Sequence, residues 1–216
     1  MTKLGHCLDG MIFSLDKKRL VQGVGVNDVD AKTIDKNGNR CIAYMKWKTM
    51  INRVYGKKAL ERNKNYVGMS CSEDFLLLSK FKVWYENQVG AYQNGFELDK
   101  DLLTIGCKVY SEDTCCLIPK EVNLFMIARV KSGDRNLPTG VTYHKPTKKF
   151  KALLNVNGKR TTLGTFSNPD DAFSCYRENK IAQAKKLAEK WEGLVDDKVY
   201  QALLNYDVYC GENIND

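Results

Sequence analysis

The chain has 216 residues, of which 43% are hydrophobic and 28% charged, a composition that excludes global disorder and allows one or two folded domains. Its net charge of +8 favours a polyanionic partner, although the needs of solubility can also account for a basic surface. No apolar run is long enough to cross a bilayer and no secretion signal begins the sequence, so we expect a soluble cytoplasmic protein with no membrane partner.

The N-terminal region from Leu20 to Asn39 is rich in Gly, Asp and Asn, and Asn37-Gly38 is typical of a tight hairpin turn. We therefore expect an irregular region that contains short strands. Eight cysteines lie along the whole chain without paired C-x-x-C spacing, which predicts reduced, mostly buried thiols rather than a zinc site.

Two helices are predicted next. Between Tyr44 and Tyr55, apolar residues recur at helical spacing, which indicates a helix with one buried face. A second helix is predicted from Cys71 to Gln88, with Ser72 as its N-cap and acidic residues in its first turn. Its aromatic stripe is expected to lie in the core.

Short strands are predicted at Phe96 to Leu98 and at Thr114 to Ile118, with a helix after Pro119. The stretch from Lys131 to Pro138 has the composition of a linker. We therefore expect a first domain at residues 1–131, a linker at 132–139, a module at 140–192 and a C-terminal tail at 193–216 that contains a short helix.

Three antiparallel strands are predicted in the module, at Val141 to His144, Phe150 to Val156 and Arg160 to Thr165, with Asn157-Gly158 as a hairpin turn. Because side chains alternate between the two faces of a strand, one face of this sheet is apolar and the other is basic and polar. The polar face is expected to carry Thr142, His144, Lys149, Lys151, Leu153, Asn155, Arg160 and Thr162.

A helix follows the sheet, with Asn168 as its N-cap and Pro169 at its first position. Its apolar stripe is expected to cover the apolar sheet face and to leave the polar face open to a ligand. The predicted fold class is α+β, with a central ββα-containing domain followed by a small three-stranded antiparallel sheet packed on one helix.

The positive charge of the chain lies in this module. The segment from Arg135 to Trp191 has twelve Lys or Arg residues and four acidic residues, whereas the rest of the chain has 22 of each sign. A single basic domain is the electrostatic pattern expected of a protein that contacts phosphates.

Several motifs of the module are similar to one DNA-binding family: Gly140-Val141, Phe150-Lys151-Ala152, Gly158-Lys159-Arg160, Leu163-Gly164-Thr165-Phe166 and Asp171-Ala172 through Tyr176. Over its whole length the module resembles the Apetala-2, or ethylene-response-factor, DNA-binding domain. The resemblance implies that the sheet enters the major groove of double-stranded DNA with its polar face. Phosphate contacts are expected from Lys145, Lys149, Lys151, Lys159 and Arg160.

The residues before the module resemble phage-encoded proteins of the HNH homing endonuclease group. This resemblance is carried by Gly23 to Asp28, Trp47-Lys48-x-Met50, Tyr66, Leu98-Asp99-Lys100-Asp101, Tyr110-Ser111 and Thr114 to Pro119. It implies a metal site with Asp99 and Asn123 as ligands, which Mg²⁺ would occupy in an active nuclease. Asp101 is a further candidate oxygen ligand, because side chains two residues apart on a strand point the same way. Lys100 stands where the family has its catalytic histidine. A lysine is protonated near neutrality, so a degenerate scaffold is expected.

Three functions are therefore open. The first is a non-catalytic double-stranded DNA-binding protein, in the host cytoplasm if the chain is phage-encoded. The second is an active Mg²⁺-dependent HNH homing endonuclease. The third is a phage effector that binds a host protein.

Overall fold

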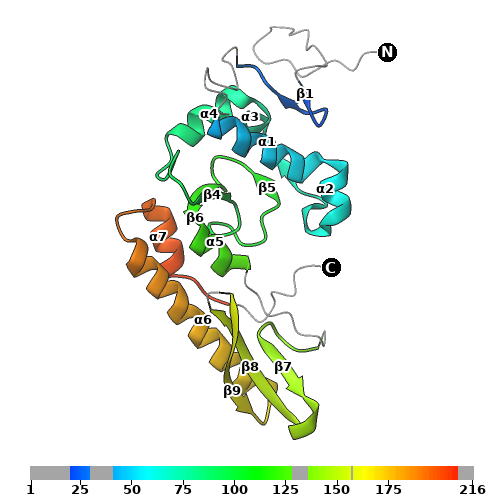
Figure 1. Cartoon of the computed structure of the whole chain (residues 1–216), viewed down its shortest axis with the longest axis vertical. Helices are drawn as coiled ribbons and strands as arrows, with labels where there is room; N and C mark the ends of the chain where they lie inside the picture. The colour runs from blue at the N-terminus through cyan, green and yellow to red at the C-terminus, as the bar shows by residue number, and fades with distance from the viewer. Residues whose placement is uncertain (1–19, 30–40, 128–135, 157, 209–216) are drawn as a thin grey trace. The chain divides into compact units, whose positions relative to one another are not determined.

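The computed structural model describes residues 20–29, 41–127, 136–156 and 158–208 (Figure 1). The chain divides into two compact units: Met1–Asn87 with Lys108–Asp113, and Gln88–Cys107 with Thr114–Asp216. Helices and strands are both present, and a three-stranded antiparallel sheet packs on a helix, which confirms the predicted α+β class. Among the described residues, no helix is both long and apolar enough to cross a membrane.

The first unit is mainly helical. Its elements are β1 (Leu20–Val21), β2 (Gly25–Val26), α1 (Ile42–Tyr55), α2 (Lys57–Arg62), the 3-10 helix η2 (Lys64–Tyr66), β3 (Ser70–Cys71), α3 (Glu73–Leu76), α4 (Leu78–Glu86) and β5 (Val109–Tyr110). Strands β1 and β2 pair antiparallel, whereas β3 and β5 pair parallel. The buried side chains of α1 and α4 form the core, where Trp47 Nε1 donates a hydrogen bond to the Phe75 carbonyl at 2.9 Å.

The helices of this unit differ from the sequence prediction in their bounds, and α2 was not predicted. Helix α1 begins at Ile42, two residues before the predicted start. The second predicted helix is interrupted at Leu77, whose extended backbone forms a parallel bridge with Val26. Ser72 is the N-cap of α3, as predicted, because its hydroxyl accepts a hydrogen bond from the Phe75 amide.

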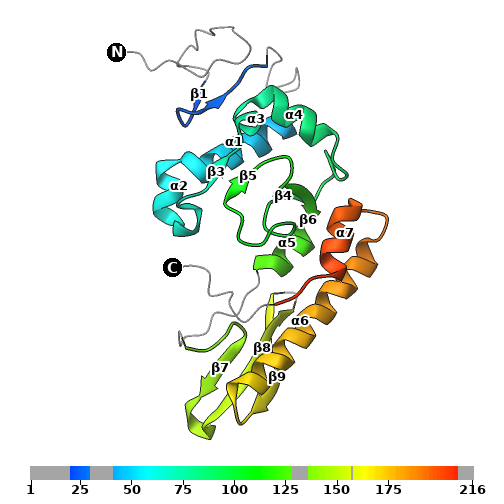
Figure 2. The same ribbon diagram turned by 180° about the vertical axis from the view of Figure 1, so that it is seen from behind.

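The second unit contains two antiparallel sheets and three α-helices among its described residues. Its elements are β4 (Phe96–Asp99), β6 (Cys116–Pro119), α5 (Lys120–Ile127), β7 (Val141–His144), the 3-10 helix η3 (Lys145–Thr147), β8 (Lys149–Val156), β9 (Lys159–Phe166), α6 (Pro169–Trp191) and α7 (Asp197–Leu204). Strands β4 and β6 pair antiparallel and α5 follows directly, so the central segment has the predicted ββα order. The second sheet has the order β7-β8-β9 (Figure 2).

The predicted linker at residues 132–139 lies inside the second unit. Helix α6 is joined to the central ββα segment by Lys180, which is 1% exposed and donates a hydrogen bond to the Phe125 carbonyl at 2.6 Å. The Lys180 ammonium also lies 3.7 Å from the centre of the Phe125 ring. The rings of Trp191 and Phe96 meet edge to face at 6.0 Å. The ββα segment and the C-terminal module therefore form one unit.

Some predictions concern residues outside the described ranges. The Asn37-Gly38 turn lies there, as do residues 132–135 of the predicted linker and Asn157 of the second hairpin turn. The pairing of Val156 with Lys159 agrees with that hairpin. The six described cysteines, which are Cys41, Cys71, Cys107, Cys115, Cys116 and Cys175, have free thiols. Of these only Cys115 and Cys116 are buried, so the prediction of mostly buried thiols is wrong for the described cysteines.

Candidate nucleic-acid interface

The register of the three-stranded sheet decides which side chains share a face. Lys151 pairs with Thr142 of β7, and Asn155 pairs with Arg160 of β9. Cross-strand partners lie on the same face, and so do alternate residues of one strand. Lys151 and Arg160 therefore point to the same side of the sheet, together with His144, Lys149 and Thr162. We call this side the polar face.

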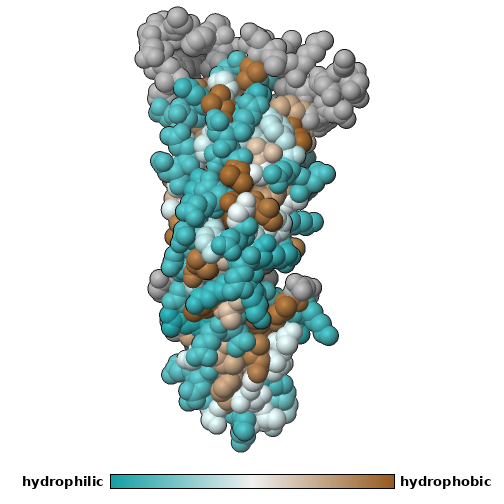
Figure 3. All heavy atoms as spheres, turned by 90° about the vertical axis from the view of Figure 1, so that its left-hand side faces the viewer, coloured by the Kyte–Doolittle hydropathy of each residue, from teal (hydrophilic) through white to brown (hydrophobic). Residues whose placement is uncertain are grey.

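Helix α6 covers the opposite face. Val141 and Ala152, which pair with each other on that face, are fully buried, and α6 buries Phe173, Tyr176 and Ala184. Figures 1 and 2 show α6 lying along the sheet. Seen from the side of α6 and α7, the surface is largely hydrophilic, with separate hydrophobic patches (Figure 3). The apolar face of the sheet is thus covered at Val141 and Ala152, whereas Tyr143, further along β7 on the same face, is 43% exposed.

Local sequence fixes how the helix and sheet meet. The Asn168 side chain accepts a hydrogen bond from the Asp171 amide at 2.8 Å, which confirms Asn168 as the N-cap of α6. At the start of β7, Gly140 has φ +82°, and a Cβ atom there would lie 2.3 Å from the Tyr176 ring. Glycine is needed at this position both for the backbone angle and for the close approach of the helix.

The predicted contact residues differ in how far they reach solvent. Lys149, Arg160 and Thr162 are exposed, whereas Thr142, His144, Lys151 and Asn155 are half-buried. Leu153 has the expected parity but is only 8% exposed, so its side chain is a core residue rather than an open contact. The expectation that Leu153 contacts DNA is therefore corrected. Alternation along a strand predicts the face on which a side chain lies, but not whether other residues cover it.

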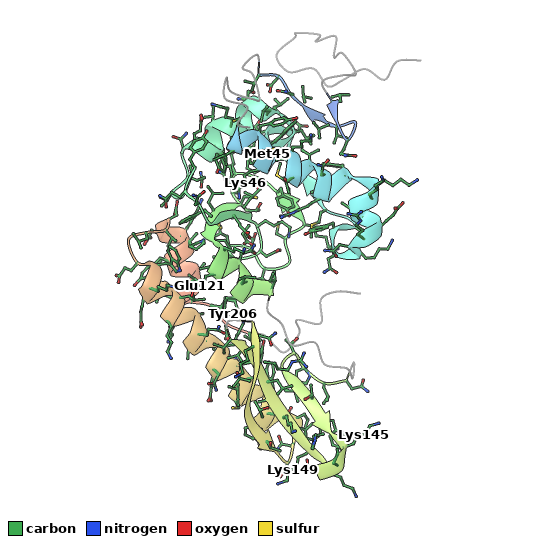
Figure 4. The ribbon with its side chains drawn as sticks, in the orientation of Figure 1. Met45, Lys46, Glu121, Lys145, Lys149 and Tyr206 are labelled. Atoms are coloured by element: carbon green, nitrogen blue, oxygen red, sulfur yellow. The ribbon has the colours of Figure 1, made fainter. Side chains whose placement is uncertain are left out.

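Two further predicted contacts lie at the ends of the sheet. Lys145 is exposed in η3 and, with Lys149, lies at the end where β7 joins β8 (Figure 4). Lys159 is exposed but pairs with Val156, so alternation places it on the face opposite Arg160. Lys159 can therefore reach a phosphate only from the end of the hairpin.

The cations of the polar face are not neutralised by neighbouring acids. Lys149, Lys151 and Arg160 form no ion pair within the described ranges. The His144 ring accepts or donates a hydrogen bond at 2.8 Å between Nδ1 and the Thr147 hydroxyl. The polar face thus combines unpaired positive charge with hydroxyl, amide and imidazole groups, which can both donate and accept hydrogen bonds.

The central ββα segment places the predicted nuclease residues in other contacts. Asp99 is 7% exposed, and its Oδ2 accepts hydrogen bonds from the Asp101 and Leu102 amides, both at 2.8 Å. Burial raises the pKa of the Asp99 carboxyl, and these amides partly oppose that effect. Lys100 is 2% exposed, and its Nζ donates to Asp101 Oδ1 at 2.5 Å and to the Cys107 carbonyl at 2.8 Å. The ammonium of Lys100 therefore acts as a buried donor in the loop after β4.

Asn123 does not meet Asp99 but donates a hydrogen bond to the Glu97 carboxylate. The sequence analysis did not predict a role for Glu97. Its position two residues before Asp99 on β4 is the signal that could have identified it, because alternate residues of a strand share a face. Within the described residues, no group of three or more His, Cys, Asp or Glu side chains could hold a metal ion. Asp99, Asp101 and Asn123 as placed do not fit a Mg²⁺ site, since Asp101 pairs with Lys100 and Asn123 with Glu97.

Comparison with known proteins identifies no relative of this chain. No protein-family model matches it, and searches of curated proteins and of solved structures return no match. The polar face and its cations are therefore the features from which a function can be inferred.

Proposed function

We propose that this protein binds double-stranded DNA through the polar face of β7, β8 and β9. The observation that carries the proposal is the common orientation of Lys149, Lys151 and Arg160, opposite the face that α6 covers. Unpaired cations on one open face can replace the counterions of several phosphates, which is the main source of affinity for DNA.

The shape and chemistry of the sheet suit the major groove. The major groove admits a helix or a β-ribbon, and its base edges offer both donors and acceptors. Thr142, His144 and Asn155 lie on the polar face, and their side chains can donate and accept hydrogen bonds. The resemblance of the module to the Apetala-2 domain supports the same face. In this arrangement the lysines and Arg160 position the duplex, and the polar residues between them contact the bases.

The proposal includes no DNA hydrolysis. A general base must accept a proton from water, and Lys100 instead donates to Asp101 and to the Cys107 carbonyl. In this proposal the ββα segment supports the module as a scaffold, through contacts such as that of Lys180 with Phe125.

The test is a titration of a labelled duplex at several salt concentrations. We expect the wild-type protein to lose about 100-fold or more in affinity between roughly 50 and 200 mM salt. The variant Lys149→Glu/Lys151→Glu/Arg160→Glu should bind at least about 100-fold more weakly at the lower salt concentration, because attraction to three phosphates becomes repulsion.

A matched control is Lys120→Glu/Lys185→Glu/Lys186→Glu, which changes the net charge equally at exposed positions on α5 and α6. This control should stay within a few-fold of wild type. Circular dichroism would verify that both variants are folded. Wild-type affinity in a folded polar-face variant would reject the proposed surface.

A further inference from the structure

A second concentration of positive charge lies in the first unit, outside the polar face. Residues 41–66, which contain α1, α2 and η2, include seven basic residues and one acidic residue, Glu61. The basic residues are Lys46, Lys48, Arg53, Lys57, Lys58, Arg62 and Lys64. The neutral total of the chain outside Arg135 to Trp191 conceals this segment, because acidic residues elsewhere balance it.

Four of these cations form an exposed cluster, Lys57, Lys58, Arg62 and Lys64, which we call the α2 surface. None of the four forms an ion pair with a residue of the described ranges. Helix α2 has no buried residue of its own, whereas α1 beside it buries Trp47 and Ile51. The charged side chains of the α2 surface are therefore exposed to solvent, on a helix that contributes no buried side chain of its own to the core. Nitrogen-tipped side chains project from α2 in Figure 4.

Two of the cations, Lys57 and Lys58, are poorly placed for the stability of α2 itself, whereas Arg62 lies in the last turn, where the helix dipole favours positive charge. Lys57 and Lys58 begin the helix, where the helix dipole disfavours positive charge, and the first turn has no acidic residue. Lys58 and Arg62 are spaced i, i+4, so their like charges repel each other along one side of the helix. A surface that serves solubility alone usually mixes charges of both signs. An anionic partner would remove this repulsion.

The neighbouring exposed residues indicate the kind of partner. At positions 57–65 every exposed residue is Lys, Arg, Glu or Asn. Protein interfaces depend on a core of apolar or aromatic anchors, and no such side chain is exposed at these positions. Phosphate groups require only positive charge and hydrogen-bond donors, which lysine, arginine and the asparagine amides supply.

We propose that the α2 surface binds the phosphate backbone of nucleic acid as a second contact, separate from the polar face of the sheet. The inference rests on the proposed function only in that the same duplex receives both contacts. It assigns to the first unit a binding role that contributes affinity without base recognition. Neutralising the surface should weaken binding equally for duplexes of different sequence.

The test compares two variants that each lose four positive charges. The first is Lys57→Gln/Lys58→Gln/Arg62→Gln/Lys64→Gln. The control is Lys80→Gln/Lys120→Gln/Lys185→Gln/Lys186→Gln, at exposed positions outside both surfaces. Glutamine is a good helix former, so both variants should keep the fold, which circular dichroism would verify.

Binding of a labelled duplex of about 30 base pairs is measured over a range of salt concentrations, since each lost phosphate contact lowers the slope of log affinity against log salt by about 0.9. We expect the α2 variant to bind about 10-fold or more weakly and its slope to fall by about 2 to 3, whereas the control keeps the wild-type slope. An α2 variant with the wild-type slope would overturn the inference.

The two proposals can fail separately in this experiment. If the polar-face variant binds normally and the α2 variant does not, the proposed function fails and the α2 surface stands as the DNA contact. If only the polar-face variant loses affinity, the α2 inference fails. Loss of binding to poly-glutamate, with duplex binding unchanged, would overturn the inference in favour of an acidic protein partner.

Discussion

A paired contact between Arg177 and Asp207 joins the segment after α7 to helix α6. Arg177 Nε donates to Asp207 Oδ1 at 2.7 Å, and Nη2 donates to the other carboxylate oxygen. The Val208 amide also donates to Oδ1, at 2.6 Å. The hydrogen bond from Arg177 lowers the pKa of the Asp207 carboxyl below its ordinary value, and the amide adds to this effect. The charged form of Asp207 is therefore favoured in the folded protein.

The variant Asp207→Asn tests this contact through its dependence on pH. A carboxylate with a lowered pKa stabilises the fold above its ordinary pKa of about 4, and this contribution is lost as pH falls through the folded pKa. We expect the variant to lose about 0.5–1 kcal/mol of unfolding free energy at pH 7, because the pair is partly exposed.

Urea denaturation of both proteins at pH 7 and at acidic pH measures the effect. The difference between wild type and Asp207→Asn should begin to shrink as pH falls below about 4, where the carboxyl of the unfolded wild type becomes protonated, and should be lost as pH falls through the lowered pKa of the folded protein. If the difference in unfolding free energy stays the same over this pH range, the loss does not come from the negative charge of Asp207.

Single residues also show where sequence reasoning reaches its limit. Alternation along β8 and β9, together with the hairpin that pairs Asn155 with Arg160, places Lys151 and Arg160 on one face, and both signals are local in the sequence. The burial of Leu153 and the pairing of Asn123 with Glu97 depend on groups that are distant along the chain. Lys100 was expected at a catalytic position, but its burial follows from the loop that brings the Cys107 carbonyl to it.

At the scale of elements, strong local signals gave correct bounds. Asn168 and Pro169 predicted the start of α6, and β7 covers the predicted residues Val141 to His144. The break at Leu77 could not be predicted, because it involves a bridge to Val26. The parallel pair β3 and β5 was also missed, since two-residue strands are too short for a visible alternation.

The packing of α6 on β7 predicts a large effect of Gly140→Ala. The new Cβ would meet the Tyr176 ring at 2.3 Å in a backbone conformation that L residues rarely adopt. We expect a loss of about 2 kcal/mol or more in unfolding free energy, from backbone strain and overpacking together. Thermal or urea denaturation measures this loss.

Gly193→Ala is the matched control for this change. Gly193 has φ +70°, but a Cβ atom there would meet no atom within 4 Å. Alanine at Gly193 therefore carries the backbone strain alone, about 1 kcal/mol. Equal losses in the two variants would mean that the contact with Tyr176 adds nothing to the requirement for glycine at position 140.

At the scale of the whole molecule, the predicted linker lies within the second unit and not between the two units. The linker composition near residue 132 predicted a boundary between the ββα segment and the module. Lys180 and Trp191 contact that segment from α6. The linker composition therefore belongs to a loop within one unit. Such contacts between elements far apart in sequence leave no periodic signal in the sequence.

The proposal for the whole chain predicts that it binds DNA without cutting it. With Lys100 held as a donor and Asn123 held by Glu97, we expect no more nicking of supercoiled DNA with Mg²⁺ than with a chelator. Agarose gels of plasmid incubated with stoichiometric protein would report nicked and linear products. Mg²⁺-dependent nicking that disappears in Asp99→Ala would instead establish an endonuclease.

The pairing of β3 with β5 has a consequence for the order in which the protein folds during its synthesis. Ser70 pairs with Val109 and Cys71 with Tyr110. The first unit therefore lacks strand β5 until residue 110 has emerged from the ribosome. By then β4 has already left the ribosome, ahead of its partner β6. The N-terminal unit therefore cannot be completed before synthesis of the second has begun, and the nascent chain must keep β4 unpaired during that interval.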